Sequence, residues 1–197
     1  KITKYFGLER DIISKTKEDI YKVVLAATEL SKKKIGALIV IERDIKLKEI
    51  IATGVALNSE ISPQILVNIF TPNTPLHDGA VVISDNKISA AACMLPLASD
   101  EDIARELGTR HRAALGISKE SDAIVVVVSE ETGKISIAKE GTLIADLKEE
   151  ALKKILISNI ITKRFKENDK KTIVEKIKNI KFKKNVSENK DINKNKL

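Results

Sequence analysis

The chain has 197 residues, of which 43% are hydrophobic and 3% aromatic, and it contains no tryptophan. That is enough apolar material for a hydrophobic core, which must be built from Ile, Leu, Val and Ala. The single cysteine, Cys93, excludes an internal disulfide framework and suits a reducing compartment. Because it lies in an apolar run, we expect inert core packing rather than nucleophilic chemistry. No apolar stretch approaches the roughly 18 residues of a transmembrane helix.

The net charge of +7 is concentrated at the C-terminal end. Residues 166–197 hold 11 lysines and five acidic residues, a net charge of +6, which leaves +1 for residues 1–165. The near-neutral body gives no electrostatic reason to expect a nucleic-acid partner. We expect this Lys/Asn-rich tail to be a largely disordered, solvated extension, the alternative being contact with an anionic membrane or nucleic acid.

In the first part of the chain, helical and strand-like patterns alternate. An amphipathic helix is predicted over residues 11–34 by the helical spacing of its hydrophobic residues, Ile13, Ile20, Val23, Val24, Ala27 and Leu30. The continuous apolar run 36–41 predicts a strand buried on both faces, which is typical of an α/β sheet. Residues 50–57 are a second strand candidate, and Pro63 after the cap residue Ser62 predicts a short helix through residue 69.

The second part begins with a loop. Two prolines among small polar residues predict irregular structure over 71–79, before a buried strand at 80–83 and a hairpin partner over 87–97. We expect a loop and a short helix over 99–107. Further predictions are a strand at 123–128, its hairpin partner at 134–138 and an amphipathic helix over 146–165, with a weak amphipathic segment at 173–182.

Three polar islands interrupt this apolar pattern: His77-Asp78-Gly79, Thr109-Arg110-His111-Arg112 and Ser129-Glu130-Glu131. In the second island, Gly108 gives a flexible entry to a helix and Thr109 is a suitable N-cap. At a helix start, the two arginines and the histidine can converge with free backbone N–H groups on one anion. Taken singly, the islands have structural explanations: a turn, a solvated basic patch and a solvated hairpin.

Together, the three islands favour a metal–nucleotide site. In α/β folds ligands bind at strand ends, where all three islands are expected. A carboxylate beside an imidazole can hold a divalent cation, and Gly79 allows a ligand to approach the backbone. Two arginines opposite the cation can neutralise a polyphosphate. The sequence has no Walker A motif and no G-x-G-x-x-G motif, so a standard P-loop or dinucleotide fold is not expected.

The segments Asn73–Ala80 (NTPLHDGA) and Gly108–Arg112 (GTRHR) resemble the two signature motifs, DGA and RHR, of diadenylate cyclases. The membrane-anchored type of Gram-positive bacteria is the most similar. Residues 35–44, 68–70 and 128–133 also resemble that type. The resemblance covers roughly residues 22–156.

This resemblance implies a single α/β domain with a mixed central β-sheet flanked by helices on both faces. It divides the chain into an N-terminal helical lead-in (1–21), a catalytic domain (22–165) and the tail (166–197). It also implies an enzyme that condenses two ATP into cyclic di-AMP with release of two pyrophosphates. A divalent metal, Mg²⁺, Mn²⁺ or Co²⁺, and a face-to-face homodimer are implied as well.

The resemblance also assigns residue roles. Asp78 would bind the metal and help activate the ribose 3′-hydroxyl, and His77 would be a further metal ligand. The remaining catalytic residues would be Arg110, His111 and Arg112, which hold the phosphates. The implied substrate-binding residues are Gly79, Ala80, Leu95 near the adenine, Gly108, Thr109, Ser129 and Glu131.

The chain begins at Lys1 and its only methionine is Met94, so we expect a piece of a longer protein. The expectation is a cytoplasmic catalytic domain whose full-length form is anchored to the cell membrane. The main alternative is a module that senses an adenine nucleotide without turning it over. Asp78 argues against that alternative, because a polyphosphate binder gains nothing from a carboxylate unless a metal lies between them. A weaker alternative is nucleic-acid binding through the tail.

Overall fold

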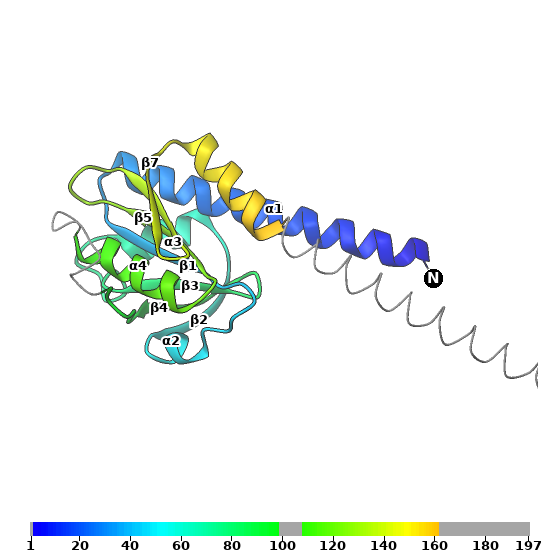
Figure 1. Cartoon of the computed structure of the whole chain (residues 1–197), viewed down its shortest axis with the longest axis horizontal. Helices are drawn as coiled ribbons and strands as arrows, with labels where there is room; N and C mark the ends of the chain where they lie inside the picture. Colours follow the sequence, from blue (N-terminus) through cyan, green and yellow to red (C-terminus); the bar gives the residue numbers. More distant parts are fainter. Residues whose placement is uncertain (1, 99–107, 162–197) are drawn as a thin grey trace, which may run out of the picture. The chain divides into compact units, whose positions relative to one another are not determined.

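The centre of the fold is a seven-stranded β-sheet with strand order β2-β4-β3-β1-β5-β6-β7 (Figure 1). The computed structural model describes residues 2–98 and 108–161, with the side chains of 11–98 and 108–161. The chain divides into two units, Lys1–Ile157 and Ser158–Leu197, and the sheet lies in the first. Within the described ranges, no helix is both long and apolar enough to cross a membrane.

The strands are β1 (Ala37–Ile41), β2 (Val55–Glu60), β3 (Ala80–Ser84), β4 (Lys87–Cys93), β5 (Ile124–Val128), β6 (Ile135–Lys139) and β7 (Thr142–Leu147). The helices are α1 (Ile2–Lys32), α2 (Lys48–Ala52), α3 (Pro63–Phe70) and α4 (Thr109–Glu120), and residues 149–157 are helical as well. The segments predicted at 99–107 and 173–182, and the tail, lie outside the described residues. The domain boundaries stay predictions.

The sheet is mixed, as predicted. β1 pairs with β3 in parallel and with β5 antiparallel, and the other four described strand pairs are antiparallel. Every residue of β1, β3 and β5 is buried. This confirms that continuous apolar runs, rather than alternating ones, mark the strands with both faces covered.

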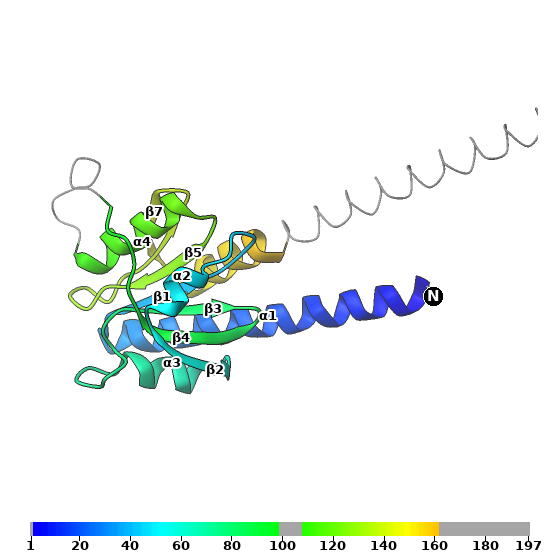
Figure 2. The ribbon, with the colours of Figure 1, turned by 90° about the horizontal axis from the view of Figure 1, so that it is seen from below.

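Helices cover both faces, as predicted (Figure 2). On one face, α2 and α4 pack against a cluster that includes Leu38, Val40, Val82, Val125, Ala114 and Ile117. On the other face lie α1 and α3. α1 starts earlier and ends two residues sooner than predicted, but its buried side chains are largely those that the helical spacing indicated: Ile20, Val23, Val24, Ala27 and Leu30.

The strand predicted over 50–57 is wrong in its first half, where the chain forms α2. Ile50 and Ile51 pack on the hydrophobic cluster from this helical turn, so a short apolar run was consistent with either structure. Gly54 separates α2 from β2. A Cβ at Gly54 would lie 2.5 Å from both the Ala91 carbonyl oxygen and the Cys93 sulfur, so only glycine fits beside β4.

The strand β7 was not predicted. Glu140 and Gly141 have φ angles of 51° and 72°, which are those of a two-residue hairpin turn between β6 and β7. The helix predicted from residue 146 therefore begins at residue 149, and Asp146 belongs to β7. The hairpin of β3 and β4 was predicted correctly around Asp85-Asn86, although β4 ends at Cys93 rather than at residue 97.

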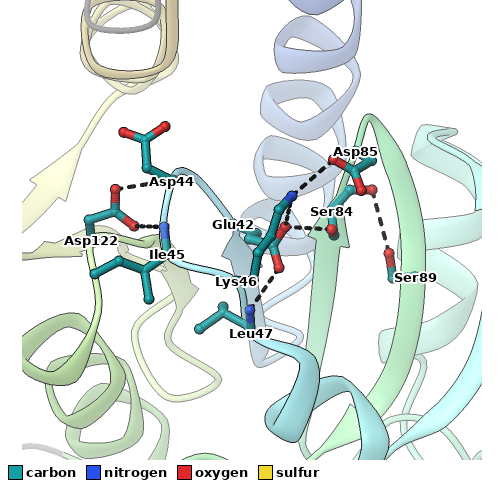
Figure 3. Close-up of polar contacts among 9 residues, drawn as sticks. All are labelled: Glu42, Asp44, Ile45, Lys46, Leu47, Ser84, Asp85, Ser89 and Asp122. Atoms are coloured by element: carbon teal, nitrogen blue, oxygen red, sulfur yellow. Dashed lines mark hydrogen bonds and ion pairs between the residues drawn. The ribbon is translucent and has the colours of Figure 1, made fainter.

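A buried carboxylate fastens the loop after β1 to the neighbouring strand (Figure 3). The Oε1 atom of Glu42 accepts hydrogen bonds from Ser84 Oγ at 2.6 Å and Lys46 Nζ at 2.8 Å. Its Oε2 atom accepts one from the Leu47 amide at 2.8 Å. Burial raises the pKa of Glu42, but these hydrogen bonds lower it more, and the net pKa lies below its ordinary value of 4.5.

We expect Glu42→Gln to lower the free energy of unfolding at neutral pH by about 1–3 kcal/mol. The NH₂ group of the glutamine amide would face hydrogen-bond donors from which the Glu42 carboxylate now accepts. A carboxyl pKa that is lower in the folded state stabilises the fold above the unfolded pKa and loses this effect as pH falls through the folded pKa. The difference from wild type should therefore be complete above about pH 5 and shrink below 4.5.

Urea unfolding at pH 7 and pH 4 measures this difference. The matched control is Glu29→Gln, which removes a glutamate from the exposed ion pair with Lys33 and should change stability by less than about 0.5 kcal/mol. Equal stability of Glu42→Gln and wild type at pH 7 would contradict the assigned role.

Candidate active site

The three polar islands meet at one edge of the sheet. β1 and β3 begin at this edge, since Ile39 lies opposite Val81 in their parallel pairing. β5 ends there, because Val128 lies opposite Ala37. β4 ends there too, with Cys93 opposite Ala80. The chain therefore places the segment before β3 and the segment after β5 on either side of the start of β1.

Asp78 is exposed, and its carboxylate has no hydrogen-bond or ion-pair partner among the described residues. This argues against the turn explanation, because a turn-forming aspartate bonds a nearby backbone N–H. Gly79 has a φ of +101°, and a Cβ there would lie 2.8 Å from the Ala92 carbonyl carbon. The approach of β4 thus requires glycine. Ala80 is fully buried and is the first residue of β3.

His77 is half-buried and fixed by its own loop. Its Nδ1 lies 2.6 Å from the carbonyl oxygen of Thr74, and since a carbonyl only accepts, Nδ1 carries the proton. The Nε2 lone pair is therefore left for a ligand, as in histidines whose other nitrogen is held by a backbone carbonyl. Among the described residues no group of three potential metal ligands is found.

The cation-rich island starts α4, but the N-cap is Gly108 and not Thr109 as predicted. Gly108 is in an extended conformation, and its carbonyl accepts hydrogen bonds from the amides of His111 and Arg112. Glycine is also an accepted N-cap residue, so the helix starts one residue earlier than the cap preference of threonine suggests. Thr109 is exposed at the first helical position.

The side chains of Arg110 and His111 lie near the island after β5. Arg110 forms an ion pair with Glu130, with NH1 at 2.7 Å from Oε2. His111 is half-buried, and burial lowers its pKa although the nearby Glu131 charge raises it. His111 is therefore mostly neutral at pH 7 and acts there as a hydrogen-bonding group. The Arg112 carbonyl accepts a hydrogen bond from the Ala98 amide, which ties α4 to the segment after β4.

The island after β5 forms the turn into β6. Ser129 Oγ accepts a hydrogen bond from the Thr132 amide at 3.2 Å, and the Ser129 carbonyl accepts one from Gly133. Glu131 is exposed. Leu95, in the segment after β4, is partly buried and packs against the hydrophobic cluster. The sequence-predicted site residues of the described chain thus gather at the same edge of the sheet.

The family of the chain follows from comparison with known proteins. A family model described as "DisA bacterial checkpoint controller nucleotide-binding", abbreviated DAC, matches residues 24–143. The chain belongs to this family. The matched range contains all three islands, so the resemblance inferred from the DGA and RHR motifs is confirmed.

Individual relatives agree with this assignment. The cyclic di-AMP synthase CdaA of Bacillus subtilis is 50% identical over 153 residues, which are 78% of this chain and 54% of that protein. A crystal structure of DacA from Staphylococcus aureus is 46% identical with a TM-score of 0.71, covering 73% of this chain and 96% of that one. A structure described as a hypothetical membrane spanning protein from Bacillus cereus is 47% identical with a TM-score of 0.62, over 64% and 62%. The chain spans about half the length of this CdaA and of a similar diadenylate cyclase from Listeria monocytogenes.

Two residues of this DAC-family site were not singled out from the sequence. Gly36 precedes β1 and was read only as the start of a buried strand, although a glycine at a strand entrance is a signal of close approach. Glu130 was read as part of a polar island without a role of its own. The structure places both beside Arg110. Cys93, in contrast, is buried as predicted, and burial raises the pKa of its thiol to about 11, so it is unreactive.

Proposed function

We propose that this chain is the catalytic part of a diadenylate cyclase, which condenses two ATP into cyclic di-AMP and two pyrophosphates. The observation that carries the proposal is an exposed Asp78 without a partner among the described residues. It lies just before β3, and only β1 separates β3 from β5, which leads to Glu130 and its ion pair with Arg110. Nucleotidyl transfer requires a carboxylate and a cation close to the nucleotide. Here both lie at the same edge of the sheet and outside the hydrophobic core. The names of the relatives support the same chemistry.

In this proposal each ribose 3′-hydroxyl oxygen bonds the α-phosphorus of the other ATP. The bond from that phosphorus to the oxygen bridging the β-phosphate breaks, and pyrophosphate leaves with the electron pair. Asp78 takes up the hydroxyl proton as the new bond to phosphorus forms. Thr109, Arg110, His111 and Arg112 bind the phosphates, with His111 as a neutral partner and the arginines as cations.

A divalent metal fits the acidic part of the site. His77 Nε2 and the Asp78 carboxylate would hold Mg²⁺, Mn²⁺ or Co²⁺, which would neutralise phosphate charge and acidify the attacking hydroxyl. The described residues contain no group of three such ligands, so phosphate oxygens and water would complete the coordination. The binding set is completed by Gly79, Ala80, Gly108, Ser129 and Glu131 around the nucleotide and by Leu95 near the adenine.

The full-length protein is proposed to be membrane-anchored with this part in the cytoplasm. The support is the greater length of its relatives and the description of the Bacillus cereus protein as membrane-spanning. No nucleic-acid partner is proposed, because the basic charge lies almost entirely in residues 166–197.

The first prediction concerns Asp78→Asn. Turnover of ATP should fall by on the order of 100-fold or more, since the carboxylate acts on the reacting hydroxyl. The melting temperature should stay close to that of wild type, because the side chain is exposed and has no described partner. Mass identification of the products formed from ATP with Mg²⁺ or Mn²⁺ measures the effect. ATP binding by wild type without any turnover would instead favour a nucleotide-sensing module.

The second prediction separates the site from the basic tail. Arg110→Ala and Arg112→Ala should each lower kcat/KM for ATP by roughly 10- to 100-fold, because hydrogen bonds to charged groups contribute about 1.5–3 kcal/mol. Deleting residues 167–197 should leave kcat/KM unchanged, although it removes most of the net charge. Loss of ATP binding on tail deletion, with the arginine variants active, would place the site elsewhere.

The third prediction concerns assembly. The sequence contains one DGA motif, which begins at Asp78, and one RHR motif, which begins at Arg110, so one chain binds one ATP and two chains must face each other. Specific activity should rise with enzyme concentration until dimers saturate. Inactive Asp78→Asn chains mixed with wild type should lower the rate more than dilution does. A strictly linear rate from a chain that stays monomeric with substrate bound would leave the dimer without support.

A further inference from the structure

The Arg110 guanidinium lies directly over Gly36, a buried residue immediately before β1. A Cβ at Gly36 would lie 2.6 Å from Arg110 NH1, 2.7 Å from Arg110 Cζ and 2.9 Å from Glu130 Oε2. Glu130 holds the same NH1 atom at 2.7 Å. Three segments far apart in the sequence thus define the position of one guanidinium.

Gly36 differs from the other crowded glycines. At Gly54, Gly79, Gly116 and Gly133 the nearest atoms to a new Cβ include backbone. At Gly141 they belong to the Lys119 side chain, but its φ of +72° itself favours glycine. At Gly36 the three nearest atoms all belong to the ends of two long side chains. The backbone therefore does not require glycine at this position, but the location of the Arg110 guanidinium does.

We propose that Gly36 and Glu130 form a seat that positions Arg110 for a nucleotide phosphate, a proposal that rests on the proposed function. A guanidinium has five N–H donors in a fixed plane, so NH1 can bind Glu130 while other donors face a phosphate oxygen. Gly36 and Glu130 are positioning residues, since they act through Arg110.

The exposure of the Arg110–Glu130 ion pair indicates that the pair orients the guanidinium rather than stabilises the fold. The side chains of Arg110 and Glu130 are 26% and 60% exposed, and ion pairs this close to water contribute little to folding. Orientation matters more, because a misplacement of about 1 Å in a reacting complex costs up to 100-fold in rate. The competing explanation is a surface ion pair without effect on the nucleotide.

The test uses Gly36→Ala, Glu130→Ala and Glu130→Gln in the full chain. Affinity for α,β-methylene-ATP with Mg²⁺ is measured by calorimetry, beside the melting temperature and cyclic di-AMP formation. Gly36→Ala and Glu130→Ala should each weaken analogue binding by about threefold to tenfold, with the melting temperature changed by less than about 2 °C. Glu130→Gln keeps an acceptor for NH1 and should recover part of the affinity.

The matched control is Glu60→Ala. Glu60 is 66% exposed and pairs with Lys15 at 3.3 Å, so it resembles Glu130 in exposure and in charge partner but lies at the far end of β2. Its loss should leave the analogue affinity unchanged.

Combining Gly36→Ala with Arg110→Ala distinguishes a glycine that is needed to position the guanidinium from one that is needed by the backbone itself. Once the guanidinium is gone, Gly36→Ala should have no further effect on affinity, because the added methyl then displaces no group that binds the phosphate. Wild-type affinity of both Gly36→Ala and Glu130→Ala would overturn the seat. An undiminished effect of Gly36→Ala without Arg110 would overturn it too. If wild type binds the analogue with this pattern but forms no cyclic di-AMP from ATP, the seat stands and the proposed function fails.

Discussion

The pairing of β1 with two neighbours of opposite direction is the constraint on which the site depends. Parallel strands begin at the same edge, and an antiparallel strand ends where its neighbour begins. β1 is parallel to β3 and antiparallel to β5, so Gly79, Gly36 and Ser129 reach one edge from distant parts of the sequence.

The approach of α4 is a second constraint, and it acts through small residues. A Cβ at Gly116 would lie 2.9 Å from the Ala98 amide nitrogen, so α4 packs directly on the backbone of the segment after β4. The Ala98 amide also donates to the carbonyl of Arg112. The helix start therefore cannot slide along the sheet, and its cations keep their position over the entrance to β1. Core packing and the proposed binding of phosphate depend here on the same close contact.

The strands and turns that depend on a local sequence pattern could be predicted from the sequence. Apolar runs revealed the strands buried on both faces, and paired turn residues revealed the β3–β4 hairpin. β7 was missed because a Glu-Gly turn is a weaker signal than Asn-Gly, and α2 was missed because a short apolar run fits a helix or a strand. The three polar islands were recognised by residue type, and the structure brings Arg110 of one beside Glu130 of another. Gly36 and Glu130 were not assigned a role, because it depends on a tertiary contact with Arg110 that no local pattern records.

The two edges of the sheet divide stability and function between them. At the edge where β1 and β3 end, Glu42 is buried and accepts hydrogen bonds from three groups, so its charge is compensated within the fold (Figure 3). At the edge where they begin, Asp78 has no described partner, and Arg110 is held by a half-exposed carboxylate. A charge that is already hydrogen-bonded within the fold gains little free energy from binding a ligand. A charge without such partners is hydrated, and a ligand can replace its water. The groups that contribute least to folding are therefore those most able to bind a charged nucleotide.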